Sequence, residues 1–211
     1  MRLIVFLASL LAIATPALAA PLPAAQLQAG DLLFVTASQA GLSGAINDAT
    51  GRQGQDSYDH VGLVAGHGDS AQVLHADQEG ARAQALDDFL QEAGAKQRQV
   101  AAYRLRDASD AVIQQGIATA RGLLGKPYNA TYVPNPDSLY CSDLIERAFR
   151  AHAIFALQPM NFRNPQTGVI DDWWVAFYAG HGMAVPQGVP GSNPNDMARS
   201  PALHHLGEVV R

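Results

Sequence analysis

The chain has one cysteine, Cys141, among its 211 residues. A single cysteine cannot form an intramolecular disulfide, nor can it supply the several thiolates of a cysteine-ligated zinc site. The chain must therefore fold around a hydrophobic core, and a content of 48% hydrophobic and 16% charged residues is sufficient for one. The formal net charge of −5 gives no general attraction to DNA or RNA, so no nucleic-acid partner is expected.

Residues 1–19 have the pattern of a secretory signal peptide. A short basic start precedes an uncharged apolar run at 3–13, and Ala17-Leu18-Ala19 has the small-x-small form of a cleavage site. The run is shorter than the roughly 20 residues that span a bilayer, which argues against a membrane anchor. We therefore expect export to the bacterial periplasm, no stable membrane insertion after cleavage, and a single mature domain at 20–211.

Hydrophobic periodicity and turn residues predict an α+β domain. Strands are predicted at 30–36, 60–65, 71–76 and 100–106. Helices are predicted around 86–90, from a cap at Ser109 to Gly125, and at about 139–151. Residues 37–56 are expected to form a loop or weak helix, and 179–201 to be largely loop, with Asn193 in a capping position. The pattern assigns no role to the 179–201 segment or to Trp173 and Trp174.

Two histidines lie on the strands of a predicted hairpin. If its turn centres on His67 and Gly68, His60 lies directly opposite His75. Opposite residues project to the same face with Cβ atoms about 5 Å apart, so the two imidazoles can form a hydrogen bond. One of them can then act as a base while the other fixes its tautomer and orientation.

Cys141 precedes an amphipathic helical pattern. With Ser138 as the N-cap, Cys141 lies in the first turn, where free N–H groups and the helix dipole favour a thiolate. A lone thiol is prone to oxidation in an exported protein, but the alternative of a buried, inert cysteine remains open at this point. Metal binding by Asp59, His60, His75 and Asp77 is a weaker alternative, since neighbouring strand residues face opposite ways.

Several short segments together resemble a known superfamily. They are Gly30-Asp31, His60-Val61-Gly62-Leu63-Val64, Leu74-His75-Ala76, Leu124-Gly125-Lys126-Pro127-Tyr128, Tyr140-Cys141-Ser142-Asp143-Leu144 and the segment 193–201. They resemble the NlpC-type papain-like cysteine peptidases and amidases. Because the cysteine follows the histidines, the order resembles the circularly permuted branch of YiiX and YebB proteins, which is related to lecithin-retinol acyltransferase-like enzymes. The resemblance implies a permuted papain-like fold with an antiparallel sheet or half-barrel packed against helices.

The resemblance also implies a function. Cys141 would be the nucleophile, His60 its base and His75 the residue that orients His60, with no cofactor and no metal. Tyr128, Tyr140 and Ser142 are candidate substrate-binding residues. The expected activity is cleavage of an amide bond, foremost in peptidoglycan stem peptides or related cell-wall peptides. The alternatives are a lipid or acyl-ester or acyl-amide hydrolase or acyltransferase with the same triad, and a non-catalytic ligand-binding domain that retains the fold.

Overall fold

The computed structural model describes residues 20–211, so the predicted signal peptide lies outside the described residues. A seven-stranded sheet runs through the molecule in the order β1-β9-β6-β2-β3-β4-β5. Every neighbouring pair in it is antiparallel except β1 with β9. Its strands are β1 (Leu22–Pro23), β2 (Leu32–Thr36), β3 (Tyr58–Ala65), β4 (Gln72–Asp77), β5 (Gly80–Ala85), β6 (Val100–Leu105) and β9 (Leu203–Val210). A second, two-stranded sheet pairs β7 (Gln158–Pro159) with β8 (Pro190–Gly191).

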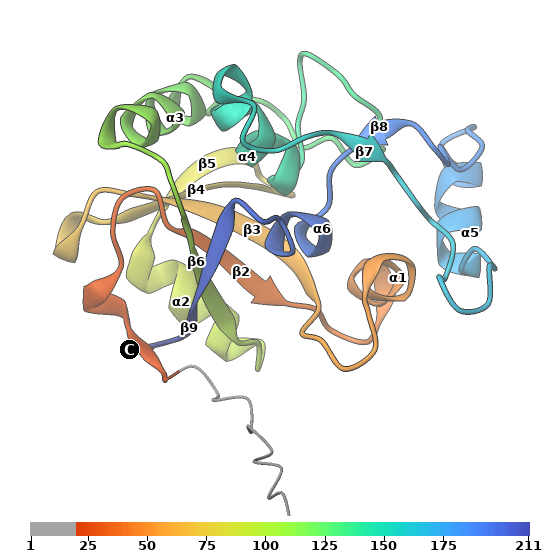
Figure 1. Ribbon diagram of the computed structural model, residues 1–211. Helices are drawn as coiled ribbons and strands as arrows, with labels where there is room; N and C mark the ends of the chain where they lie inside the picture. The colour runs from red at the N-terminus through yellow and green to blue at the C-terminus, as the bar shows by residue number, and fades with distance from the viewer. Residues whose placement is uncertain (1–19) are drawn as a thin grey trace, which may run out of the picture.

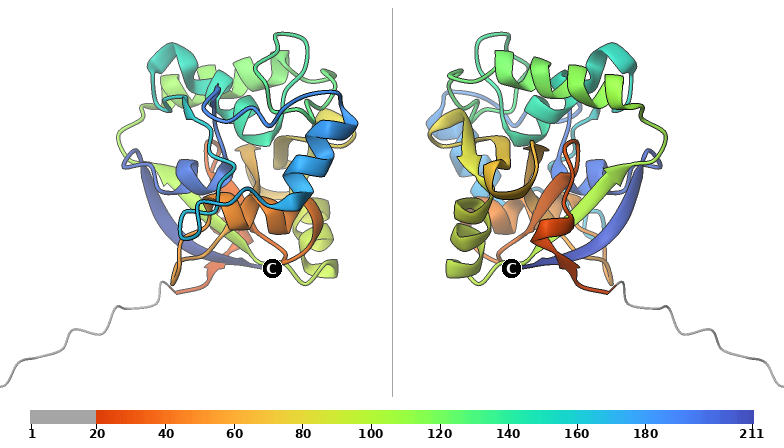
Figure 2. Two further views of the ribbon diagram at one scale, coloured as in Figure 1. Left: turned by 90° about the vertical axis from the view of Figure 1, so that its right-hand side faces the viewer. Right: turned by 90° about the vertical axis from the view of Figure 1, so that its left-hand side faces the viewer.

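Helices cover both faces of the main sheet, as Figure 1 and the two side views in Figure 2 show. Helices α3 (Asp110–Gly122) and α4 (Cys141–Phe149) pack on one face, and α2 (Leu86–Ala95) packs on the other. At one end, α1 (Gly41–Thr50) contacts α5 (Asp172–Gly180) around an aromatic cluster. The remaining helical elements are α6 (Pro194–Ala198) and the 3-10 turns η1 (Ala24–Gln26), η2 (Gly68–Ser70) and η3 (Arg150–His152).

The capping residues at two helix starts match the sequence pattern. The Ser109 hydroxyl accepts a hydrogen bond from the Val112 N–H at the start of α3, and the Asn193 side chain accepts one from the Asp196 N–H at the start of α6. Helix α3 approaches α4 closely because it carries Gly116: a Cβ atom there would lie 2.4 Å from the buried ring of Phe149. This contact sets the position of the helix that begins at Cys141.

Gly30 and Asp31 form a structural junction before β2. Gly30 has a φ of +93°, and a Cβ there would lie 2.6 Å from Ile113. The fully buried Asp31 carboxylate accepts two hydrogen bonds from the Arg104 guanidinium, at 2.7 and 2.8 Å, and one from the Gln28 N–H. The buried charge is thereby paired, and the start of β2 is tied to β6.

The predicted hairpin forms, but its register differs from the prediction. Leu63 lies opposite Leu74, and continuing this register puts Gly62, not His60, opposite His75. The turn is centred one residue later than expected, because the connection contains η2. The shift is two residues along the strand, and an even shift leaves every side chain on its original face. His60 and His75 therefore remain on one face, as diagonal neighbours.

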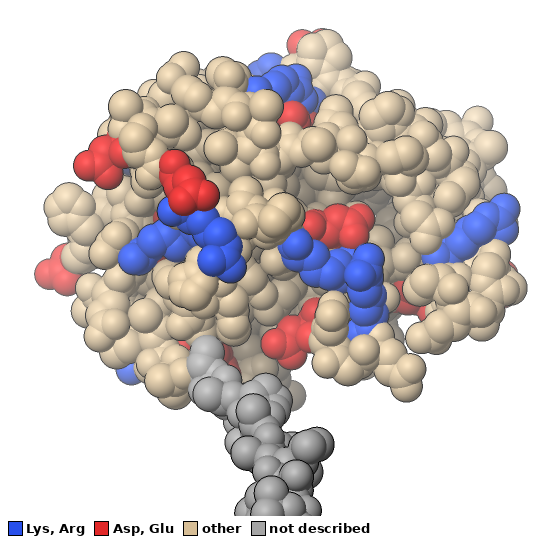
Figure 3. Space-filling model, in the orientation of Figure 1, with Lys and Arg blue, Asp and Glu red and all other residues tan. Residues whose placement is uncertain are grey.

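Several other elements of the structure were not predicted from the sequence pattern. The α1 segment, expected as loop or weak helix, is helical, and the sheet contains β5 and β9, which the periodicity did not indicate. Helix α5 ends at Gly180, and β8 and α6 interrupt the segment 179–201 that was expected to be largely loop. No helix among residues 20–211 is long and apolar enough to cross a bilayer. Acidic and basic side chains are interspersed on the face in Figure 3, most of which carries no charge.

Candidate active site

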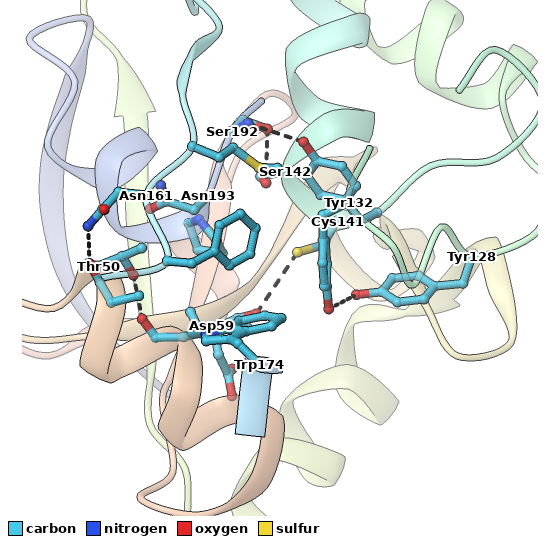
Figure 4. Close-up of a pocket in the computed structure, with 16 residues that line it drawn as sticks. Thr50, Asp59, Tyr128, Tyr132, Cys141, Ser142, Asn161, Trp174, Ser192 and Asn193 are labelled. Atoms are coloured by element: carbon cyan, nitrogen blue, oxygen red, sulfur yellow. Dashed lines mark hydrogen bonds between the residues drawn. The ribbon is translucent and has the colours of Figure 1, made fainter. Parts of the chain in front are cut away.

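Cys141 is the first residue of α4, and Tyr140 is the N-cap in place of the expected Ser138. Tyr140 has extended backbone angles and no side-chain capping bond, so the first N–H groups of α4 are not satisfied by a cap side chain. The thiol is 5% exposed and packs against β3. Its sulfur lies 4.0 Å from the carbonyl oxygen of Asp59 (Figure 4).

Burial and the backbone N–H groups near the start of α4 have opposite effects on the pKa of the Cys141 thiol. Burial raises the pKa of Cys141 to about 11, because a thiolate loses its hydration there. The backbone N–H groups of Val61, Ser142 and Cys141 itself act against this rise. These donors can stabilise negative charge at the start of α4, whether on the sulfur or on an oxygen bound beside it.

The raised pKa predicts how Cys141 reacts with iodoacetamide. The thiolate is the reactive form, so the rate should be low at pH 7 and rise about tenfold per pH unit towards the thiol pKa. The measurement is labelling rate against pH by mass spectrometry, and Cys141→Ser should show no labelling. A fast rate that stays constant between pH 5 and pH 8 would contradict this prediction, since it would indicate a stable thiolate–imidazolium pair.

His60 on β3 and His75 on β4 form the predicted hydrogen bond. Their Nε2 and Nδ1 atoms, respectively, are 2.9 Å apart, and the ring planes are nearly perpendicular. Both rings pack against Phe89 of α2. Burial lowers the pKa of each imidazole below its ordinary value, so both rings are neutral at pH 7. Because the hydrogen bond uses Nε2 of His60, only its Nδ1 is left for another partner.

The thiol and the imidazoles approach β3 from different sides. Cys141 belongs to the cluster beneath α3 and α4 that contains Val61, whereas the two imidazoles contact Phe89 on the face that α2 covers. The sulfur contacts the backbone on both sides of His60, through the Asp59 carbonyl and the Val61 N–H. The structure thus brings the two histidines together and sets the thiol against the peptide that carries His60. The hydrogen-bond partner of the thiol is the Asp59 carbonyl, not an imidazole.

A small pocket opens beside the sulfur. It has a volume of about 50 Å³ and is lined by Ile46, Ala49, Thr50, Asp59, Tyr128, Tyr132, Tyr140, Cys141, Ser142, Met160, Asn161, Phe162, Trp174, Ser192, Asn193 and Pro194. Aromatic and aliphatic side chains dominate this lining. Its one ionisable carboxylate is paired, since Asp59 accepts a hydrogen bond from Arg98. The pocket therefore suits an uncharged, apolar group.

The three predicted substrate-binding residues all line this pocket. The Tyr128 hydroxyl lies 3.3 Å from that of Tyr132, and burial raises the pKa of both phenols, so both are protonated at neutral pH. Tyr140 and Ser142 also have structural contacts. The Tyr140 hydroxyl accepts a hydrogen bond from the Ser192 N–H, and the hydroxyls of Ser142 and Ser192 are 3.0 Å apart. These bonds hold the segment before α6 against the start of α4.

Sequence reasoning missed Tyr132 as a site residue. Its ring stands beside the Cys141 sulfur in Figure 4 and contacts Tyr140 and Trp174 edge to face. Tyr132 has a φ of +57°, a left-handed conformation that is rare for a bulky residue and is often found near functional sites. No local sequence pattern predicts this backbone conformation at Tyr132. Trp174 is 3% exposed and forms the pocket floor, donating its indole N–H to the Ala45 carbonyl.

A larger groove of about 810 Å³ lies on the histidine side and shares Asp59, Tyr128 and Tyr132 with the small pocket. In contrast to the pocket, it is rich in polar and charged side chains. They include Asp77, Gln78, Glu79, Arg82, Gln84, Glu92, Lys96 and Arg98, and Trp173 and Phe177 of α5 form its aromatic wall. The site thus has an apolar chamber on the cysteine side and a charged groove on the histidine side.

The described residues give no support to the metal-binding alternative. Within residues 20–211, no group of three or more His, Cys, Asp or Glu side chains is arranged to hold a metal ion. His75 lies 3.8 Å from the Asp77 carboxylate, but that carboxylate is bound by Arg82. Asp59 is likewise bound by Arg98.

Known proteins share the fold described above. A family profile described as permuted papain-like amidase enzyme, YaeF/YiiX, C92 family, matches residues 26–207. A solved structure, metalloprotein YiiX from Escherichia coli O157:H7, is similar with a TM-score of 0.70 and 21% sequence identity, covering 87% of this chain and 98% of that one. At that identity the likeness shows the fold. No curated protein matches the chain significantly.

Proposed function

The chain belongs to the permuted papain-like amidase family YaeF/YiiX, C92, and we propose that it is an exported amidase with Cys141 as nucleophile. In this proposal His60 is the general base and His75 orients it. The observation that carries the proposal is the position of the chain's only thiol. Cys141 begins a helix, beside free backbone donors, and packs against the peptide that bears His60. An inert core cysteine needs none of these features.

The first half of the proposed reaction acylates the enzyme. In the free enzyme thiol and imidazole are both neutral, and His60 Nδ1 accepts the thiol proton as the sulfur attacks the amide carbonyl. The thiol is bonded to the Asp59 carbonyl in the structure, so this step requires the thiol and the His60 imidazole to turn towards each other when substrate binds. The carbonyl oxygen becomes an oxyanion that the Cys141 N–H at the start of α4 stabilises. The C–N bond then breaks, and His60 returns the proton to the leaving amine.

The second half releases the acyl group. A water molecule enters on the side that the amine has left, and His60 accepts a proton from it as its oxygen attacks the thioester. The tetrahedral intermediate collapses with cleavage of the C–S bond. The carboxylic acid leaves and the thiol regains its proton from His60, so the enzyme returns to its starting state. His75 keeps the ring of His60 in one orientation throughout, through the 2.9 Å hydrogen bond between them.

The two cavities together favour a substrate with an apolar acyl part and a polar amine part. The small pocket beside Cys141 favours an apolar acyl group, because it is lined by aromatic and aliphatic side chains. The groove on the histidine side favours a polar or charged amine as the leaving group. An amide of an apolar acyl group with a polar head, such as an N-acyl amino acid, satisfies both.

The groove also supports a second candidate, the cell-wall peptide that we expected first. Its acidic and basic side chains suit the charged groups of a peptidoglycan stem peptide, in particular on the amine side of the cleaved bond. The predicted export would bring the enzyme to this substrate. A stem peptide must place its acyl side near the apolar pocket, so we expect a small apolar side chain adjacent to the cleaved carbonyl.

A direct substrate comparison tests the proposal. The purified mature domain is incubated separately with N-propionyl glycine, whose short acyl group suits the small pocket, with purified muropeptides and with phospholipid vesicles, and the products are read by mass spectrometry. Cys141→Ser serves as the control for each. We expect a free acid and a free amine from the N-acyl amino acid, and none with the variant. Cleavage of muropeptides alone would support the cell-wall candidate. Cleavage of none, together with tight binding of one, would favour a non-catalytic binding domain and contradict the proposal.

A further inference from the structure

Two buried side-chain atoms lack a hydrogen-bond partner in the part of the chain that the structure describes. They are Nε2 of His75 and Oε1 of Gln84. Buried polar atoms are rarely left unpaired in folded proteins, so each such atom calls for an explanation. Gln84 lies opposite Val73 in the β4–β5 pair, two residues from His75, and both side chains line the charged groove. The two unpartnered atoms therefore belong to diagonal neighbours on one face of the sheet.

The orientation of the Gln84 amide follows from its other contact. Its Nε2 lies 3.1 Å from a carboxylate oxygen of Glu92 on α2, and the other oxygen of that carboxylate accepts a hydrogen bond from Lys96 at 2.7 Å. A carboxylate only accepts hydrogen bonds, so the amide must present its NH₂ group to Glu92. The amide oxygen is then the end of the side chain left for His75. Gln84 is near enough to act against the fall in the His75 pKa that burial causes.

The amide oxygen can accept a hydrogen bond but cannot donate one. A neutral His75 that pairs with it must carry its proton on Nε2. Its Nδ1 then has a lone pair and must accept the hydrogen bond from Nε2–H of His60, 2.9 Å away. That leaves a lone pair on Nδ1 of His60, the form that a general base requires. In the opposite tautomer, His75 Nδ1 donates to His60 Nε2, and His60 carries its proton on Nδ1 and cannot act as a base there.

We propose that Gln84 is a positioning residue that selects the productive tautomer of both histidines, by accepting a hydrogen bond from Nε2–H of His75. This inference rests on the proposed function, because it assigns His60 as the base. Glu92 supports the role by holding the amide in the required orientation. The chain of groups runs from α2 through Gln84 and His75 to His60. The charge on Glu92 is shared with Lys96 and does not reach the imidazoles through a hydrogen bond.

Imidazole nitrogen NMR tests the tautomers without any substrate. Long-range ¹H–¹⁵N spectra of ¹⁵N-histidine-labelled protein at pH 7 distinguish a protonated from an unprotonated ring nitrogen, and His60→Ala and His75→Asn provide the assignments. In the unmodified chain we expect both histidines to be protonated at Nε2 and unprotonated at Nδ1. In Gln84→Met, which keeps the length of the side chain and removes the acceptor, we expect a mixture of tautomers at both rings.

A matched control separates this role from general effects on the fold. Gln99 also donates its amide N–H to a carboxylate, that of Glu208, at 3.2 Å, but it is exposed and remote from the histidines. Gln99→Met should leave both tautomers and the amidase activity unchanged. Gln84→Met should lower kcat/KM by about 10- to 100-fold with little change in KM, the usual scale for a residue that orients a catalytic group.

A charge-conserving exchange provides the rescue. In the double variant Gln84→Glu/Glu92→Gln, a carboxylate accepts from His75 and an amide donates to that carboxylate, so the selected tautomer is kept. The groups that face His75 are His60 of β3, Asp77 of β4, Arg82 of β5 and Glu92 of α2. Moving a negative charge from Glu92 to position 84 favours protonated His75. The acidic limb of the pH–rate profile should therefore shift to higher pH, while activity at pH 8 recovers.

The outcomes distinguish this inference from the proposed function. Mixed tautomers in Gln84→Met support the inference even if none of the tested amides is cleaved. Unchanged tautomers in Gln84→Met, or a His75 protonated at Nδ1 in the unmodified chain, overturn it even if the enzyme is active. Failure of the exchange variant to restore the tautomers would also overturn it, provided that thermal unfolding shows the variant to be folded.

Discussion

Replacing Cys141 with serine or alanine is expected to abolish amide hydrolysis, with a loss of about 10⁴-fold or more, the scale expected when the nucleophile of an acyl-transfer enzyme is removed. A serine hydroxyl is far less acidic than a thiol, and burial makes His60 a weaker base by lowering its pKa, so His60 deprotonates the hydroxyl much less readily than the thiol. The measurement is kcat/KM with the best substrate found above. Alanine removes only the sulfur, so the pocket should keep its shape and its affinity for the substrate.

The controls for Cys141 concern folding and binding. Because the thiol is buried in the core beneath α4, both variants should unfold at a slightly lower temperature than the unmodified protein but remain folded. Substrate binding by calorimetry should persist in Cys141→Ala. If Cys141→Ala hydrolyses the substrate at the unmodified rate, the cysteine mechanism is wrong.

Replacing His60 with alanine should have the second largest effect, a loss of about 10²- to 10⁴-fold, the range for removal of a general base. Without the imidazole, hydroxide in solution must take the thiol proton. The residual rate should therefore rise with pH towards the thiol pKa, which burial raises to about 11. The measurement is the pH–rate profile of the variant beside that of the unmodified enzyme. Retention of full activity in His60→Ala would remove His60 as the base.

His75→Asn should be milder than His60→Ala. An asparagine oxygen can accept the hydrogen bond from Nε2–H of His60 and so replace part of the orienting role. The matched control is His67→Ala, which removes an exposed imidazole in the connection between β3 and β4 of the same hairpin. We expect this variant to keep its activity. An effect of His67→Ala as large as that of His60→Ala would indicate that the hairpin tolerates no substitution, and would contradict a specific role for His60.

Much of the fold could be predicted because its signals are local. The alternation of apolar residues predicted that His60 and His75 lie on one face of a hairpin. This prediction is correct although the predicted register was wrong, because a shift of two residues leaves each side chain on its face. The caps at Ser109 and Asn193 depend on residues three positions apart. By contrast, the sequence pattern did not indicate β9, although this strand pairs along β6 and joins it to β1. Its pairing partner is about 100 residues earlier in the chain, so no local pattern reveals it.

The walls of the site are the part that the sequence could not indicate. The small pocket combines residues of α1, the segment 128–142, the segment 160–162, α5 and the segment before α6. Tyr132 adopts a left-handed backbone conformation beside the sulfur, and Trp174 reaches the pocket floor from α5. These contacts arise from packing between segments that are distant in the sequence. A tyrosine or tryptophan could occupy many other places in a fold, so its residue type alone does not predict that it lines the pocket.

The sequence by itself determined the order of the reactive groups along the chain, the family to which they belong and the shared face of the two histidines. These properties depend on motifs a few residues long and on the two-residue period of a strand. The tertiary structure alone decided that the thiol meets the backbone around His60 rather than an imidazole, and that Gln84 and Glu92 lie behind His75. It also decided that an apolar chamber and a charged groove meet at Asp59. Such relations depend on which distant segments pack together, and that is settled by burial across the whole core and not by any local pattern.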